Sequence, residues 1–141
     1  MFDYIIKDLD SYLGFKFENL IKTYLIEQNN NKDNVFNFEQ IGSFWKRSNA
    51  TNDNKEIDIV AVDKKNKIAL IGECKLKSKK IDQKLINDLI RKSEFIDKLK
   101  NYKKIYFIFT VEELPEEKKS FLIKNNFKFL SLEKILKSYR V

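Results

Sequence analysis

Residues 56–76 read Glu-Ile-Asp-Ile-Val-Ala-Val-Asp-Lys-Lys-Asn-Lys-Ile-Ala-Leu-Ile-Gly-Glu-Cys-Lys-Leu, and this stretch decides the fold. Two β-rich runs, 56–63 and 67–76, flank a polar break at 64–66, which predicts a β-hairpin. Apolar residues face both sides of these runs, as is typical of central strands that are covered on both faces. If Lys65 and Asn66 form the turn, residue 64 pairs with residue 67, and the numbers of paired residues sum to 131.

This register places Asp58 opposite Glu73, and Glu56 opposite Lys75. The face that the first acidic residues share is predicted to comprise Glu56, Asp58, Val60 and Val62. Two carboxylates directly opposite each other repel unless a positive group lies between them. A divalent cation with oxygen ligands fits that gap. An acidic pair alone is more often a solvated face, but charges at the ends of buried strands are costly without partners, which favours a functional site.

Four short motifs follow one another along the chain: Gly14-x-x-Phe17-Glu18, Ile41-Gly42-x-x-Trp45, Glu56-x-Asp58 and Glu73-Cys74-Lys75. This ordered set resembles the PD-(D/E)xK nuclease superfamily of restriction endonucleases and Holliday-junction resolvases. More narrowly, it is similar to the uncharacterised nuclease-like domain at the C-terminus of a family of archaeal ATPases. The resemblance covers roughly residues 12–110. Ile57 stands where the superfamily often has a proline, and the chain has no P-loop of its own.

The resemblance implies an α/β fold with a restriction-endonuclease-like core, in which helices flank a central mixed sheet. It also implies a metal-dependent nuclease that hydrolyses phosphodiester bonds, with DNA as the expected substrate and RNA left open. Its metal ligands for one or two Mg²⁺ or Mn²⁺ ions would be Asp58, Glu73, the backbone carbonyl of Cys74 and Glu18. Lys75 would orient the attacking water or offset charge in the transition state, and Glu56 would be a partner of Lys75. The thiol of Cys74 is expected to face the opposite side, within the core.

Composition limits the alternatives. The 141 residues carry 28 Lys and Arg against 21 Asp and Glu, a net charge of +7, and contain no histidine. Catalysis by Ser-His-Asp or Cys-His groups and most zinc sites are therefore excluded. The positive charge favours a nucleic-acid partner, although a lysine-rich composition also reflects genome bias. The single cysteine agrees with a cytoplasmic protein, and no apolar run is long enough to predict a membrane span.

Basic residues near the ends of strands are candidates for contact with phosphate. They are Lys46, Arg47, Lys77, Lys79 and Lys80. The last three form a loop directly after the strand that carries Glu73. Trp45 could stack on a base, although a lone tryptophan near the end of a strand more often packs in the core.

The remaining pattern predicts further helices and strands around the hairpin. A first helix from Asp10 or Ser11 to about Gln28 has an apolar stripe comprising Leu13, Phe17, Leu20, Ile21, Tyr24 and Leu25. Strands are expected at 35–46, 105–111 and 127–130, and helices at 82–100, 115–124 and 131–139. Pro115 would be the first residue of its helix. Residues 1–10 would form a lead-in to a single domain at 11–141.

Two other classes of function stay open. A non-catalytic module could keep the fold and bind nucleic acid or an ATPase, either as a partner or as part of a parent chain. Intact Asp58, Glu73 and Lys75 argue against this reading, because a degenerate nuclease would be free to lose them. In a pure protein-interaction domain the net charge would be incidental. A homodimer is also open, since many nucleases of this fold work as dimers.

Overall fold

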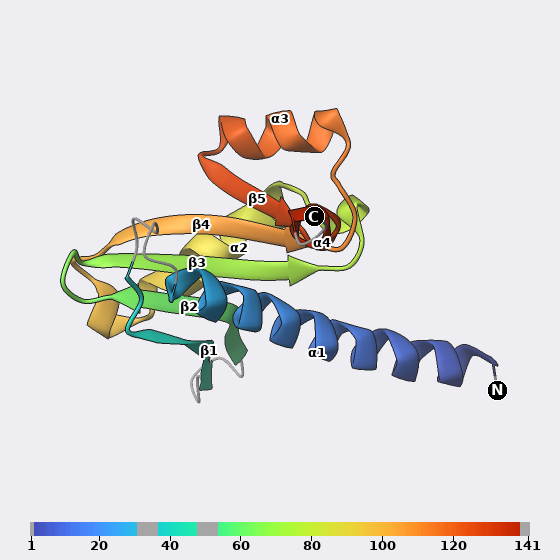
Figure 1. The fold of residues 1–141 in the computed structure, drawn as a ribbon, viewed down its shortest axis with the longest axis horizontal. Helices are drawn as coiled ribbons and strands as arrows, with labels where there is room; N and C mark the ends of the chain where they lie inside the picture. Colours follow the sequence, from blue (N-terminus) through green and yellow to red (C-terminus); the bar gives the residue numbers. More distant parts are fainter. Residues whose placement is uncertain (1, 31–36, 48–53, 139–141) are drawn as a thin grey trace.

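The chain folds into a five-stranded mixed sheet with helices on both faces, as a computed structural model shows (Figure 1). The structure describes residues 2–30, 37–47 and 54–138, except for the side chains of 2–13, 15, 45–47, 54, 55 and 138. Its strands are β1 (Gln40–Arg47), β2 (Asn54–Asp63), β3 (Ile68–Lys75), β4 (Lys103–Thr110) and β5 (Phe127–Ser131). Its helices are α1 (Phe2–Asn29), α2 (Gln83–Glu94), α3 (Glu116–Lys124) and α4 (Leu132–Ser138), with short 3₁₀ turns at Ser78–Lys80 and Asp97–Leu99.

The strands lie in the order β1-β2-β3-β4-β5. The pairs β1–β2 and β2–β3 are antiparallel, whereas β3–β4 and β4–β5 are parallel. Helix α2 connects the parallel strands β3 and β4, as such a crossover requires. The predicted fold class, a mixed sheet flanked by helices, is therefore confirmed. No helix in the described part of the chain is long and apolar enough to cross a membrane.

The central hairpin forms in the predicted register. Asp63 pairs with Ile68 and the ladder continues to Ile59 and Gly72, so paired numbers sum to 131. The turn is longer than predicted and occupies residues 64–67. A two-residue Lys-Asn turn would need a positive φ at both positions, whereas only Lys67 takes one here, at 53°. Hydrogen bonds from the side chain of Asn66, at 2.9 Å, and from its backbone N–H, at 3.2 Å, lower the pKa of Asp63 and close the turn.

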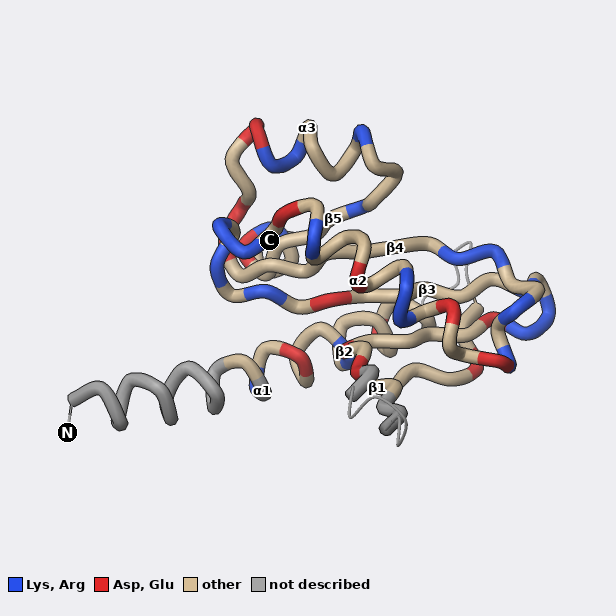
Figure 2. The backbone as a smooth tube through the Cα atoms, turned by 180° about the vertical axis from the view of Figure 1, so that it is seen from behind, with Lys and Arg blue, Asp and Glu red and all other residues tan. Residues whose placement is uncertain are grey.

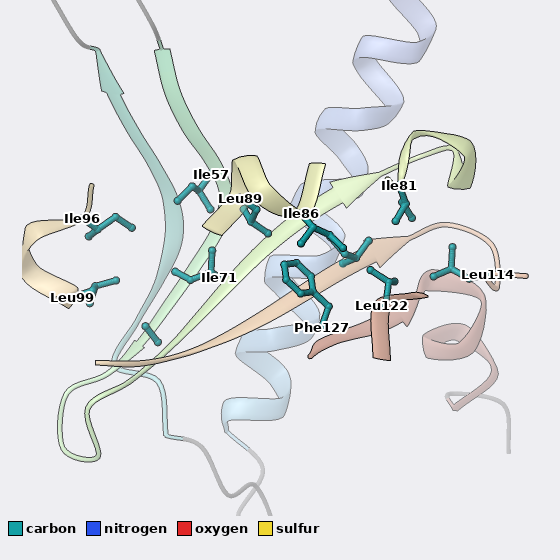
Figure 3. Close-up of a cluster of buried hydrophobic side chains, with 12 residues drawn as sticks. Ile57, Ile71, Ile81, Ile86, Leu89, Ile96, Leu99, Leu114, Leu122 and Phe127 are labelled. Carbon is teal, nitrogen blue, oxygen red and sulfur yellow. The ribbon is translucent and has the colours of Figure 1, made fainter. Parts of the chain in front are cut away.

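Strand β2 separates from β3 beyond the pair Ile59–Gly72. From there β2 continues beside β1 as far as Asn54, while β3 continues beside β4 as far as Lys75. Figure 3 shows β1 and β2 bending away together from β3. We call the opening between β2 and β3 the fork. Because Asp58 and Glu73 follow the last pair, they lie at its mouth.

A β-bulge in the β1–β2 ladder lies beside the fork. The register shifts between Gly42 and Phe44, so that Asp58 and Ile59 both oppose Ser43. The extra residue changes the alternation of side chains, and Ile57 therefore packs in the same core cluster as Val60 and Val62. The prediction that Glu56 shares the face of Val60 and Val62 is wrong for this reason.

Two clusters of buried side chains hold the layers together. One lies between the sheet and α2 and includes Ile57, Ile71, Ile86, Leu89 and Phe127 (Figure 3). The other lies under α1 and includes Phe17, Ile21, Leu25, Ile59 and Phe109. The stripe on α1 is thus largely as predicted, but Leu20 is 52% exposed because it lies at the outer margin of the helix.

Several ends of helices and strands differ from the predictions. Helix α1 begins at Phe2, so the described lead-in residues are helical rather than a separate segment. Strand β1 begins only at Gln40, and residues 35 and 36 lie outside the described part. Asp82 caps α2 by accepting a hydrogen bond from the N–H of Leu85, at 2.9 Å, but the helix ends at Glu94, well before residue 100. Pro115 is the N-cap of α3 and not its first residue.

Candidate functional site

Three carboxylates from three elements meet at the fork. Asp58 comes from the bulge in β2, Glu73 from β3, and Glu18 from α1. The side chain of Asp58 is hydrogen-bonded to Glu18 and to Glu73. Figure 2 shows acidic segments of α1, β2 and β3 close together where the helix crosses the sheet. The predicted proximity of Asp58 and Glu73 is therefore found, although the two residues follow the last pair of the β2–β3 ladder and are not themselves paired. Glu18 lies beside them, as the helical pattern suggested.

Two carboxylates of the cluster have raised pKa values. Burial, followed by the charge and hydrogen bond of Asp58, raises the pKa of Glu73 to about 8, and Glu73 is only 9% exposed. Burial and Asp58 also raise the pKa of the half-buried Glu18 to about 7. Carboxylates this close cannot all be charged without a compensating cation. A shared proton would relieve the repulsion, and so would a bound cation.

The backbone of Cys74 is directed into the fork. Its N–H donates a hydrogen bond to Oδ2 of Asp58 at 2.9 Å, in the place where a continued β2–β3 ladder would supply a carbonyl. In a β-strand the N–H and C=O of one residue point toward the same edge, so the carbonyl of Cys74 also points toward β2. The carbonyl of Cys74 therefore faces the same side of the strand as its N–H, toward Asp58.

The thiol of Cys74 has a different environment from its backbone. It packs against the core cluster under α1, on the face that the alternation along β3 predicts. Burial and the nearby charges of Asp58, Glu18 and Glu73 raise the pKa of the thiol. The sulfur therefore stays protonated and is a poor nucleophile.

Cations lie on the α2 side of the cluster. The ammonium of Lys75 is 3.7 Å from Oε1 of Glu73, and Lys92 of α2 also lowers the pKa of Glu73 by its charge. The predicted position of Glu56 opposite Lys75 is not found, because the strands have already separated there and Glu56 pairs with Trp45 of β1. Glu56 is exposed, and its charge raises the pKa of Glu18.

Lys22 and Ser43 belong to the site although sequence reasoning missed them. Nζ of Lys22 donates to Oγ of Ser43 at 2.6 Å, and Ser43 donates to the backbone carbonyl of Asp58 at 2.9 Å. These two hydrogen bonds connect α1 to the bulge that presents Asp58. Lys22 follows Glu18 by one helical turn, and that spacing was the only available signal, because the contact with β1 depends on where the bulge forms.

The basic loop that follows β3 lies between two clefts. One has a volume of about 240 Å³ and is lined by Gly14, Cys74, Lys75, Leu76, Lys77 and Lys80. The other, of about 330 Å³, is lined by Leu76, Lys77, Ser78, Lys79, Thr110, Glu112 and Glu113. Lys118 of α3 holds the end of the loop by donating to the carbonyl of Ile81 at 2.7 Å. The predicted Lys77 and Lys80 thus share a cleft with Cys74 and Lys75, and Lys79 lines the second cleft. The side chains of Trp45, Lys46 and Arg47 lie outside the described part.

The residues at the fork fit a hard divalent cation by their chemistry. Carboxylate and carbonyl oxygens are the ligands that Mg²⁺ and Mn²⁺ prefer. Among the described residues, no group of three or more His, Cys, Asp or Glu side chains could hold a metal ion in its present conformation. The predicted inner set needs only two side chains, those of Asp58 and Glu73, together with the carbonyl of Cys74. Glu18 would have to move to become an additional ligand.

The chain matches the family DUF234, described as "Archaea bacterial proteins of unknown function", over residues 1–86. The chain belongs to this family. The DUF234 match includes the carboxylates of the fork, Lys75 and the basic loop. A relative from Methanocaldococcus jannaschii, "Uncharacterized protein MJECL04", is 39% identical over 103 residues, which are 72% of this chain. The match covers 22% of the relative's length, so this chain spans only a fraction of that protein. No solved structure matches the chain.

Proposed function

We propose that the protein is a metal-dependent nuclease that hydrolyses phosphodiester bonds, with DNA as its expected substrate. The observation that carries this proposal is the meeting of Asp58 and Glu73 at the fork, with Lys75 3.7 Å from Glu73. The raised pKa of Glu73, to about 8, indicates that Lys75 and Lys92 do not fully offset the burial of Glu73 and the charge of Asp58, which supports a site for an added cation. Buried carboxylates with strongly shifted pKa values are more common in functional sites than in purely structural ones.

Each residue of the fork has a role in the proposal. Asp58 and Glu73 would hold one or two Mg²⁺ or Mn²⁺ ions with the carbonyl of Cys74. The bound cation would lower the pKa of a water and polarise the phosphoryl oxygen. Lys75 orients the water or offsets charge that develops on the phosphate. Glu18 supplements the acidic cluster from α1, and the positive charges of Lys77, Lys79 and Lys80 attract the nucleic-acid backbone.

The resemblance to the PD-(D/E)xK superfamily extends this proposal. The order of elements and the position of the fork agree with the restriction-endonuclease-like core that the motifs suggested. More narrowly, the motifs are similar to those of the nuclease-like domain at the C-terminus of a family of archaeal ATPases. The protein would then act in the cytoplasm, either as part of a longer parent chain or with a separate ATPase partner. A parent chain would be consistent with the relative's greater length, of which the match covers 22%.

The proposal is tested by cleavage of supercoiled plasmid, branched duplex, single-stranded DNA and RNA with Mg²⁺ or Mn²⁺. Wild type is compared with Asp58→Ala and Glu73→Ala, and with Glu117→Ala as a control that removes an exposed carboxylate from α3. We expect metal-dependent cleavage that both fork variants lose and the control retains. Calorimetry should show Mn²⁺ binding that is lost in the same two variants.

The opposite outcomes distinguish the other classes of function. Absence of cleavage and of Mn²⁺ binding, together with salt-sensitive binding of nucleic acid, would replace the nuclease with a non-catalytic nucleic-acid-binding module. Absence of nucleic-acid binding as well would leave a protein-interaction domain. In that case an ATPase would be the first partner to test, because it accompanies the domain in the resembled family.

A further inference from the structure

Gly14 lies in the interior of α1, where glycine is unfavourable. Glycine loses more backbone entropy in a helix than alanine does, so an interior glycine usually has a specific reason. Neither a positive φ nor close packing supplies one here. Among the described residues no glycine has a positive φ, and a Cβ on Gly14 would meet no heavy atom within 4 Å. By contrast, a Cβ on Gly72 would lie 2.7 Å from the ring of Phe109.

The open space beside Gly14 is the cleft of about 240 Å³ that reaches from α1 to the basic loop. Gly14 shares this cleft with the residues that follow Glu73 on β3, including Cys74 and Lys75. Gly14, Glu18 and Lys22 are spaced by four residues, so they form one stripe along α1. The cleft therefore continues the same site along the helix, beyond the carboxylates.

The charges of the cleft indicate what it could bind. Its described lining includes Lys75, Lys77 and Lys80 and no acidic residue. The ammonium of Lys75 is held beside Glu73, so Lys77 and Lys80 are the lysines available to an anion in the cleft. The neighbouring cleft of about 330 Å³ is less suitable for an anion, because Glu112 and Glu113 line it. A polyanion would therefore prefer the cleft beside Gly14. At Gly14 the backbone of α1 itself lines the cleft, because glycine has no side chain.

We propose that this cleft binds the sugar–phosphate backbone of a nucleic-acid strand next to the phosphate that the fork would receive. Lys77 and Lys80 neutralise its phosphates, and Gly14 allows the strand to approach the helix closely. The inference deepens the proposed function and rests on it, because it names where the substrate strand continues. It also assigns Gly14 a role in binding that is separate from hydrolysis.

The first measurement is binding of fluorescent single-stranded and duplex oligonucleotides in EDTA, where metal-dependent cleavage does not occur. Wild type is compared with Gly14→Ala and Gly14→Leu. The alanine variant should be at least as stable thermally as wild type, since the new Cβ fills open space and favours the helix. We expect affinity to fall several-fold for Gly14→Ala and about tenfold or more for Gly14→Leu. Asn19→Leu, which adds similar bulk at an exposed position of α1, should bind like wild type.

The lysines provide a second measurement. Lys77→Met and Lys80→Met should each weaken binding and reduce the slope of log affinity against log salt by about 0.7–0.9. Lys124→Met removes the same charge from the exposed end of α3 and should leave the slope unchanged. A similar change for all three lysines would indicate only an effect of net charge and would overturn the assigned cleft.

Failure of this inference is distinguishable from failure of the nuclease proposal. If Gly14→Leu is folded and binds as wild type does, or if wild type binds no oligonucleotide, the cleft assignment is wrong. If wild type never cleaves but loses affinity through Gly14→Leu and the two lysine variants, the cleft is supported and the catalytic proposal fails. Should Gly14→Leu not fold, the alanine variant decides, because it combines retained stability with the expected loss of affinity.

Discussion

The carboxylate of Asp58 accepts a hydrogen bond from the backbone N–H of Cys74 at 2.9 Å, across the point where β2 and β3 separate. This contact replaces a ladder hydrogen bond and holds Asp58 next to Glu73. The backbone of Asp58 is held as well, because Ser43 donates to its carbonyl at 2.9 Å. The acidic pair is therefore constrained from both sides even though its charges repel.

Asp58→Asn should separate stability from function. An asparagine Oδ1 can still accept the N–H of Cys74, but the charge that raises the pKa values of Glu18 and Glu73 is removed. We expect the variant in EDTA at pH 8 to be more stable than wild type by about 1 kcal/mol, while Mn²⁺ binding and cleavage are lost. Urea denaturation and calorimetry measure the two effects. Asp97→Asn, at an exposed position, serves as the control, and a less stable Asp58→Asn would contradict the proposed repulsion.

The stability of the protein in EDTA should fall as the pH rises from about 4.5 to about 8. The pKa of Glu18 is raised from 4.5 to about 7 and that of Glu73 from 4.5 to about 8, so the folded state binds more protons than the unfolded state in this window. The free energy of unfolding therefore decreases as these protons are removed. Denaturation at several pH values measures the slope. Glu73→Gln should make this slope smaller. Stability that rises with pH would mean that nearby cations already compensate the charges of the carboxylates.

Gly72→Ala should destabilise the sheet. Its Cβ would lie 2.7 Å from Cε2 of Phe109 and 3.3 Å from Cβ of Ile59, and both neighbours are fully buried. Because such a core cannot easily rearrange, we expect a loss of about 1–3 kcal/mol in the free energy of unfolding. Gly42→Ala is the matched control, since a Cβ there meets nothing within 4 Å. Equal effects of the two substitutions would show that strand propensity, rather than the contact with Phe109, determines the cost.

Cys74→Ala should retain Mn²⁺ binding and any cleavage, because the backbone carbonyl and not the thiol faces the fork. The raised pKa of the thiol also predicts slow reaction with a disulfide reagent at pH 8 in the folded protein and fast reaction after unfolding in guanidinium. Thiol labelling and plasmid nicking test these statements. Loss of cleavage in a folded Cys74→Ala variant would place the side chain, rather than the carbonyl, in the site.

Lys22→Met should impair the positioning of Asp58 without unfolding the protein. Lys22 donates to Ser43 at 2.6 Å, and Ser43 donates to the carbonyl of Asp58; Lys22 also lowers the pKa of Glu18 by its charge. We expect Mn²⁺ affinity and kcat to fall several-fold with little change in KM, and faster hydrogen exchange at the amide of Cys74. Lys22→Arg should recover most of the loss, since it keeps a cationic donor. If methionine and arginine have equal effects on kcat and on exchange, the relay through Ser43 is not a positioning device.

Local patterns in the sequence predict much of the fold. The apolar residues of 56–63 and 68–76 predict a buried hairpin, and a period of two with one possible turn region is enough to define its register. The cap at Asp82 and the buried stripe of Phe17, Ile21 and Leu25 likewise follow from residue type and spacing. The extra residues in the turn did not disturb the register, because Lys64 to Lys67 lengthen the loop symmetrically about the same centre.

The sequence by itself thus determined the hairpin, its register and the proximity of Asp58 and Glu73. Only the tertiary structure decided that β2 leaves β3 at these residues, since separation depends on which neighbouring strand each one follows. It also decided the bulge at Ser43, the position of Glu56 and the contact of Lys22, because these arise from packing of α1 and β1 on the hairpin. Local periodicity specifies which faces are buried, whereas contacts between elements far apart in the chain specify which polar groups meet.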